Sequence, residues 1–177
     1  MTATTNSGTA NLGTTATSAI AATSATSTGP LSGVHVLDLT WVMVGPTSTR
    51  FLADLGAEVV KIESSERLDP VRTLGPFLDD VAGVNQSVSY HNFNSGKRSI
   101  ALDLKRSEAR AVLDPLIAWA DVVVESFAPG AAARLGLDDA GVRAVRDAAI
   151  MVSTSIGGPE WGGGVGTMGA AISGATH

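Results

Sequence analysis

The chain has 177 residues, of which 44% are hydrophobic and 16% charged, and its formal net charge is −5 at pH 7. This is enough for one domain with a core, or for part of a larger domain. The acidic balance argues against a general nucleic-acid binder. The absence of cysteine excludes a disulfide framework, and the three histidines lie too far apart in sequence to predict a metal site. The absence of cysteine permits the cytoplasmic location that we expect. No apolar run approaches the ~20 residues of a membrane helix.

Residues 1–30 differ from the rest of the chain, since they contain no charged residue and are dominated by Ala, Thr, Ser and Gly. They lack the features of a signal or transit peptide. Such a segment buries too little apolar surface to offset the entropy lost on ordering. We therefore predict a disordered tail that ends at Gly29-Pro30 and a domain over residues 31–177.

After this tail, short β-branched runs alternate with helical patterns. Strands are expected at residues 34–39, 57–63, 98–104, 121–127 and 149–155. Helices are expected at 45–56, at 107–120 and after Asp138. The alternation predicts an α/β fold, a Rossmann-like parallel sheet with flanking helices. In such sheets, ligands bind in the loops beyond the carboxyl ends of the strands.

Several residues predict where the helices begin and end. Pro46 suits the first turn of helix 45–56, Thr47 or Ser48 can cap its free N–H groups, and Gly56 should end it. Pro115 should kink or split helix 107–120 because it removes an N–H.

In the second half of the chain, Asp138 is a predicted N-cap, with Leu137 and Val142 spaced as a hydrophobic staple. Residues 64–92 show no clear period and predict a long loop of the kind that is often functional. A final helix is expected at 167–172.

Glycines and bulky side chains near the strand ends leave two interpretations open. No G-x-G-x-x-G follows the first strand, so the dinucleotide fingerprint is absent, and the glycine-rich stretch 158–166 lacks the Lys of a P-loop. Trp41 and Met43 either fill the core or contact a ligand. Phe127 either stacks on a planar ring or covers the core.

Three bases surround the strand at 98–104, namely Lys97, Arg98 and Lys105. Lys105 follows this strand and Arg134 follows the next, so both are expected at the edge of the sheet where an anion would bind, although either could be an ordinary surface cation. Lys97 and Arg98 precede the strand and are interpreted as loop cations or local structural partners. The carboxylates look scattered, and no catalytic constellation stands out.

The order of four segments resembles the class III CoA-transferases, the family of formyl-CoA transferase, carnitine CoA-transferase and bile-acid-inducible relatives. The segments are LSGVHVLDLTWVMVGPTSTRFLADLGAEVVKIES, NFNSGKRSIALDLK, ADVVVESFAPGAAARLGL and AIMVSTSIGG, within residues 31–177. The stretches WVMVGP and GVGTMGAAISG look most similar to the benzylsuccinate CoA-transferase branch.

The resemblance implies that coenzyme A, as a substrate thioester, binds in the loops after the strands, with no metal. The implied CoA contacts are Met43, Val44, Ser64, Leu102, Asp103, Leu104, Lys105, Ser126, Phe127, Ala128 and Arg134. Two of these positions depart from the family pattern, because Ser126 stands where the family usually has Asn and Ser64 where it often has a basic residue.

The resemblance also implies CoA transfer between a CoA thioester and a small carboxylic acid, through an aspartate nucleophile and an intertwined homo- or heterodimer. That aspartate is expected beyond the segments found here. We therefore predict an N-terminal part of the large domain that binds CoA, carries no catalytic residue and is inactive alone. The alternative is a non-catalytic CoA- or nucleotide-binding partner subunit of a heteromeric transferase.

Overall fold

One sheet of five parallel strands, in the order β3-β2-β1-β4-β5, forms the centre of the computed structural model, which describes residues 28–155. The strands are β1 His35–Leu39, β2 Glu58–Glu63, β3 Arg98–Ala101, β4 Val122–Glu125 and β5 Ile150–Ser153. The predicted α/β fold with a Rossmann-like parallel sheet is confirmed.

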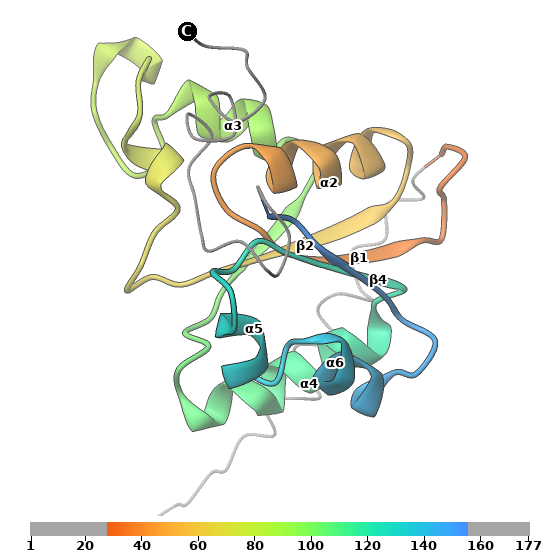
Figure 1. Ribbon diagram of the computed structural model, residues 1–177. Coiled ribbons are helices and arrows are strands. Elements are labelled where there is room, and N and C mark those ends of the chain that lie inside the picture. Colours follow the sequence, from red (N-terminus) through yellow and green to blue (C-terminus); the bar gives the residue numbers. More distant parts are fainter. Residues whose placement is uncertain (1–27, 156–177) are drawn as a thin grey trace, which may run out of the picture.

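Helices cover both faces of this sheet (Figure 1). One face carries α2 (Val44–Asp54) and α3 (Val88–Asn94). The other face carries α4 (Arg110–Trp119), α5 (Ala131–Arg134) and α6 (Asp139–Val145). Short 3₁₀ turns lie at Pro70–Thr73, Leu78–Asp80 and Ser107–Ala109. Because both faces are covered, the central strands are apolar along most of their length, as parallel sheets require.

Alternate strand residues supply two separate cores, because successive side chains point to opposite faces. The larger core lies under α4 and α6 and includes Leu37, Leu39, Val60, Ile62, Val123, Leu113, Leu116, Ile117, Leu137 and Val142. The smaller core lies under α2 and consists of Val36, Ala57, Val59 and Val124, with Leu52 and Ala53 packed against it. The polar strand residues Asp38, Lys61 and Glu63 fall on this second face, because they alternate with Leu37, Val60 and Ile62 of the larger core.

The ends of α2 were predicted in part. Gly56 follows the helix at φ +99, a conformation that favours glycine, so its predicted role is confirmed. The predicted capping by Thr47 or Ser48 is wrong, because the N-cap is Met43 and no side chain caps it. Ser48 Oγ instead donates to the carbonyl of Val44 at 2.9 Å.

Two other local predictions have opposite outcomes. Of the kink or split predicted at Pro115, the split is wrong, because α4 runs through this residue as one helix, and the kink stays a prediction. Asp138 is the N-cap of α6, and its Oδ1 accepts from the Gly141 N–H at 3.0 Å, as predicted. Both residues of the predicted staple, Leu137 and Val142, are fully buried in the larger core.

The segment expected as a long loop contains two of the 3₁₀ turns and α3. Ser87 begins α3 by accepting from the Tyr90 N–H through its Oγ at 3.2 Å. β3 is shorter than predicted and ends at Ala101, because Asp103 turns the chain by accepting from the Lys105 N–H at 3.1 Å. Residues 1–27 of the predicted tail, the glycine-rich stretch 158–166 and the helix at 167–172 lie outside the described residues.

Within residues 28–155, none of the helices has the length and apolar character needed to cross a membrane.

Candidate functional site

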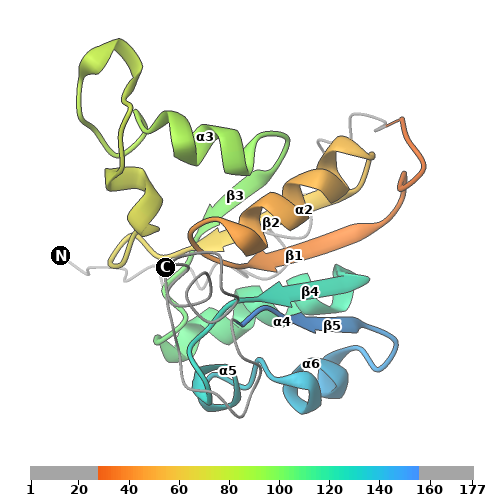
Figure 2. The ribbon, with the colours of Figure 1, turned by 45° about the horizontal axis from the view of Figure 1, so that its top comes forward.

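The residues that leave β1, β2, β3 and β4 meet at one side of the sheet, because the strands are parallel. We call this side the carboxyl edge and define it as residues 41–44, 64–69, 102–105 and 126–134. The chain continues from β1 to β2 on one side, whereas β4 pairs with β1 on the other. The carboxyl ends of β1 and β4, on the left in Figure 2, therefore mark the switch point where ligands bind in open α/β sheets.

A hydrogen bond crosses this switch point. The Trp41 N–H donates to Ser126 Oγ at 2.8 Å, joining the segments after β1 and β4. The guanidinium of Arg67, from the segment after β2, lies 5.1 Å from the centre of the Trp41 ring. Three strand ends are thus connected through Trp41.

The predicted contacts after β1 and β2 lie at the surface. Met43 is 51% and Val44 75% exposed, so Met43 faces solvent and does not fill the core. Ser64 is half-buried, and its Oγ accepts from the Glu66 N–H at 3.1 Å.

The predicted contacts after β3 divide between core and surface. Leu102 and Leu104 pack against the larger core, so a ligand contact from them would come from the backbone. Asp103 is used in the turn described above. Lys105 is exposed at the end of this turn.

After β4, Phe127 packs against the larger core, which decides its open interpretation in favour of core packing. Its N–H donates to a carboxylate oxygen of Glu125, which is buried. Ala128 is exposed, and Arg134 is exposed in the last turn of α5. All the predicted positions therefore follow strand ends on the same edge, although their side chains do not share one surface.

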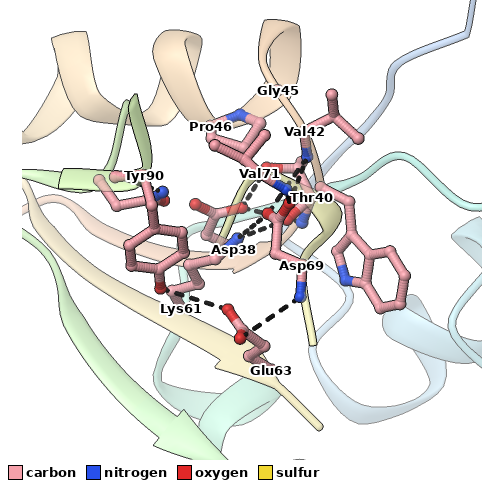
Figure 3. A network of polar contacts seen from close by, with 12 residues as sticks. Asp38, Thr40, Val42, Gly45, Pro46, Lys61, Glu63, Asp69, Val71 and Tyr90 are labelled. Carbon is pink, nitrogen blue, oxygen red and sulfur yellow. Dashed lines mark hydrogen bonds and ion pairs between the residues drawn. The ribbon is translucent and has the colours of Figure 1, made fainter. Parts of the chain in front are cut away.

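Behind the carboxyl edge lies a group of buried charged side chains that sequence reasoning missed (Figure 3). We call it the buried ionic network. Its members come from β1, β2, the segment after β2, α3 and the residue before β3, and they are Asp38, Lys61, Glu63, Asp69, Arg72, Tyr90 and Lys97. Three carboxylates thus face three cations, and the network is neutral.

Lys97 occupies one end of this network. Its side chain is 2% exposed, and its Nζ donates to Asp38 Oδ2 at 2.9 Å, to the Pro46 carbonyl at 2.8 Å and to Asn94 Oδ1 at 3.0 Å. An ammonium has three donors, and all three are used. Lys97 is therefore a structural partner rather than a solvated loop cation.

Asp38 is surrounded by donors. In addition to Lys97, its carboxylate accepts from Thr40 Oγ1 at 2.5 Å and from Thr49 Oγ1 at 2.7 Å. Burial opposes ionisation, but the charges of Lys61 and Lys97 and these hydrogen bonds outweigh it and lower the pKa of Asp38. Burial lowers the pKa of Lys97, and Asp38 opposes that shift.

Lys61 and Asp69 form the centre. Both are fully buried, and Lys61 Nζ lies 3.8 Å from Asp69 Oδ2 while donating to the Thr40 carbonyl at 2.6 Å. The Asp69 carboxylate accepts from the N–H groups of Val42, at 3.2 and 3.3 Å, and Val71, at 3.0 Å. Burial nevertheless raises the pKa of Asp69.

The other end contains Glu63, Arg72 and Tyr90. Arg72 Nε pairs with Glu63 Oε1 at 2.5 Å, and the Tyr90 hydroxyl donates to Glu63 Oε2 at 3.2 Å. The Arg72 guanidinium also lies 3.6 Å from the centre of the Tyr90 ring. Burial and the charge of Glu63 raise the pKa of Tyr90.

The network corrects the prediction that the carboxylates are scattered, because Asp38 and Glu63 belong to one connected group of buried side chains. A usable signal was present in the sequence. Lys61 interrupts an apolar strand of a sheet covered on both faces, and a charge there must be buried and paired. The three bases around β3 are likewise of different kinds, with Lys97 buried and Lys105 exposed.

Metal ligands do not gather among the described residues, where no group of three or more His, Cys, Asp or Glu side chains is placed to hold an ion.

Proteins of known family are similar in sequence to this chain. The family described as CoA-transferase family III matches residues 31–177. A succinate–glutarate CoA-transferase from Agrobacterium fabrum is 42% identical over 126 residues, covering 70% of this chain and 32% of that protein. An acetyl-CoA:oxalate CoA-transferase from Acetobacter aceti is 43% identical over 110 residues, covering 62% of this chain and 27% of that protein.

Solved structures give the same result. A CAIB/BAIF family protein from Brucella suis superposes with a TM-score of 0.66 at 40% identity, covering 72% of this chain and 33% of that one. A hypothetical protein from Mycobacterium tuberculosis superposes with a TM-score of 0.73 at 31% identity, covering 84% and 41%. The chain thus spans about a third of the length of the proteins it matches. The narrower likeness to the benzylsuccinate branch stays a prediction, but the family is shown: this chain belongs to CoA-transferase family III.

Proposed function

We propose that the carboxyl edge binds the CoA moiety of a thioester, and that the whole enzyme transfers CoA from this thioester to a carboxylic acid. Family membership supports the reaction class, and the relatives are named for CoA transfer to or from succinate, glutarate or oxalate.

One observation carries the proposed location. Among the residues that the structure describes, Lys105 and Arg134 are exposed cations of the carboxyl edge that form no ion pair with another described residue. The buried cations are compensated by carboxylates, so they offer no charge to a ligand. CoA carries a diphosphate and a 3′-phosphate, which accept charge-assisted hydrogen bonds from such cations.

The other residues of the carboxyl edge suit the parts of CoA that carry no phosphate. Exposed Met43 and Val44 offer apolar surface next to the switch point. Ser126 and Ala128 lie on its other side. Ser64 and the backbone of 102–104 complete the set of proposed contacts.

Four carboxylates beside this edge are unavailable as nucleophiles, whereas Glu66 within it is exposed. Asp38, Asp69, Glu63 and Glu125 are all buried and accept hydrogen bonds from protein donors. A carboxylate that forms a covalent acyl intermediate must reach the thioester carbon. The family resemblance implies an aspartate for this step, and the aspartates of this edge, Asp69 and Asp103, are held in local turns. We therefore expect the 177-residue chain alone to show no turnover with a CoA thioester and succinate or oxalate. The intertwined dimer implied by the family resemblance belongs to the same proposal, as does the expected cytoplasmic location.

The binding part is tested by titrating coenzyme A into the chain by calorimetry, with single variants of the two proposed cations. Lys105→Ala and Arg134→Ala should each weaken CoA binding about fivefold, the equivalent of ~1 kcal/mol for an exposed charge pair. Arg106→Ala is the matched control, because Arg106 is the neighbouring exposed cation and pairs with Glu108. An equal loss in all three variants would show only an effect of net charge and would contradict the proposed contacts.

A further inference from the structure

Val42 has an unusual backbone conformation. It lies at φ +69, in the left-handed region, directly before the proposed contacts Met43 and Val44. A β-branched side chain makes this region unfavourable, so a Val there is a genuine outlier. The Val42 side chain is 42% exposed, so tight side-chain packing does not account for the conformation.

Among the described residues, the backbone N–H of Val42 donates to one side chain, the carboxylate of Asp69. The N–H lies 3.3 Å from Oδ1 and 3.2 Å from Oδ2, so it points between the two oxygens. Asp69 lies 27 residues further along the chain, in the segment after β2. A residue of a different strand end thus fixes the turn that follows β1.

Asp69 is itself held from two further directions. Its Oδ1 accepts from the Val71 N–H at 3.0 Å, and its Oδ2 lies 3.8 Å from Lys61 Nζ. Lys61 also donates to the Thr40 carbonyl at 2.6 Å, two residues before Val42. The same buried pair therefore holds the chain at Thr40 and at Val42, on both sides of Trp41 (Figure 3).

We propose that Asp69 is a positioning residue of the CoA site, whose carboxylate holds Val42 in the left-handed conformation and thereby presents Met43 and Val44 at the carboxyl edge. This rests on the proposed function, because it assigns a role within the same site. Asp69 is fully buried and does not touch the ligand. Its effect on binding passes through the backbone of Val42.

The carboxylate is specific for this role. Asn has the same shape but only one acceptor oxygen, and its NH₂ group would face either the Val42 N–H or the Lys61 ammonium. Asp69→Asn therefore removes an acceptor without opening a cavity. Glycine at position 42 adopts positive φ readily, so Val42→Gly reduces the need for Asp69.

These two changes give a double-mutant cycle, measured as CoA affinity by calorimetry on the 177-residue chain. Asp69→Asn should weaken binding about tenfold, the equivalent of a lost hydrogen bond to a charged group. Val42→Gly should weaken CoA binding less than Asp69→Asn does. In the double variant, Asp69→Asn should add little to the effect of Val42→Gly, and this rescue is not expected if Asp69 serves only the stability of the fold.

Amide exchange of Val42, followed by NMR without ligand, reads the proposed bond independently of CoA. The amide should be protected in the parent chain and exchange faster in Asp69→Asn. If Asp69→Asn does not fold, Val42→Pro replaces it, because proline removes the N–H and fixes φ near −65° at an exposed position. CoA binding should then also fall about tenfold.

The outcomes separate the two proposals. If the parent binds CoA and Asp69→Asn or Val42→Pro binds it equally well, the positioning role is overturned and the CoA site stands. Additive losses in the cycle also overturn the role. If the parent with a protected Val42 amide does not bind CoA, the proposed function fails, and the role of Asp69 in that site fails with it.

Discussion

Lys97 and Asp38 form an ion pair of 2.9 Å inside the domain, although 59 residues separate them in sequence. Lys97 precedes β3, which is an outermost strand of the sheet, whereas Asp38 belongs to the central strand β1. The pair thus ties the edge strand to the centre under α2, where Lys97 also holds the carbonyl of Pro46. The same network continues to Asp69 and the proposed CoA edge.

Removing the cation of this pair should strongly destabilise the domain. Lys97→Met leaves Asp38 buried without its nearest cation, and loss of one partner of a buried pair costs about 3–5 kcal/mol of unfolding free energy. Urea unfolding measures this loss of unfolding free energy. Lys105→Met, at an exposed lysine eight residues later, should change the unfolding free energy by less than about 0.5 kcal/mol. Similar losses for the two variants would contradict the buried role of Lys97.

Asp38 should make stability depend on pH in a definite direction. Its pKa is lower in the folded chain, mainly because the charges of Lys61 and Lys97 overcome the effect of burial. Between the folded and the unfolded pKa the unfolded chain binds more protons, so stability rises with pH there. The contribution is complete above the unfolded pKa and is lost as pH falls through the folded value. The difference in unfolding free energy between the parent and Asp38→Asn should therefore shrink as the pH is lowered from 7 into the acid range.

Asp69 should show the opposite trend, because burial raises its pKa in the folded chain. The folded state then binds more protons between the two pKa values, so its contribution to stability is lost as pH rises through the folded pKa. The difference in unfolding free energy between the parent and Asp69→Asn should accordingly grow as the pH falls. The same trend in both variants would contradict the opposite environments of the two carboxyls.

The bond across the switch point should matter for binding. Ser126→Ala removes the acceptor of the Trp41 N–H and frees the segments after β1 and β4 from each other. A hydrogen bond of this kind contributes ~1 kcal/mol, which corresponds to about fivefold in CoA affinity. Ser155→Ala, at an exposed serine after β5, is the control and should leave affinity unaltered. Unchanged affinity in Ser126→Ala would show that this bond does not contribute to CoA binding.

Much of the sheet is predictable because each strand has a recognisable local sequence pattern. Each is a short β-branched run, and the observed strands fall within the predicted ranges. The helix α3 escaped prediction because seven residues hold too few repeats to show a period, and its beginning depends on one hydroxyl, that of Ser87. β3 was predicted too long because Leu102 and Leu104 are apolar, whereas the turn at Asp103 ends the strand.

The candidate site is predictable only to the level of the strand ends. The topology places Lys105, Ser126 and Arg134 at one edge once the sheet is parallel. The conformation of Val42 has no local sign, because a buried carboxylate 27 residues away imposes it. Sequence spacing likewise does not show that Lys97 is buried and Lys105 exposed, since this depends on the packing of α2 over β1.

Arg72 should control the segment between the first 3₁₀ turn and α3, residues 74–87. Besides pairing with Glu63, its Nη1 donates to the Val84 carbonyl and to Asn85 Oδ1, both at 2.9 Å. Arg72→Lys keeps the charge but loses this fork of donors, so limited proteolysis within 74–87 should become faster. Arg143→Lys, at an exposed arginine of α6, should leave the cleavage rate there unchanged. Equal rates in parent and Arg72→Lys would show that the segment is held by other contacts.

The central claim, that CoA binds at the carboxyl edge, is tested most directly by recording amide NMR spectra of the 177-residue chain during a titration with coenzyme A. The predicted result is that shift changes gather in residues 41–44, 64–69, 102–105 and 126–134. Shift changes confined to the opposite edge of the sheet, near residues 33–35, 56–58 and 120–122, or no changes at millimolar CoA, would contradict it.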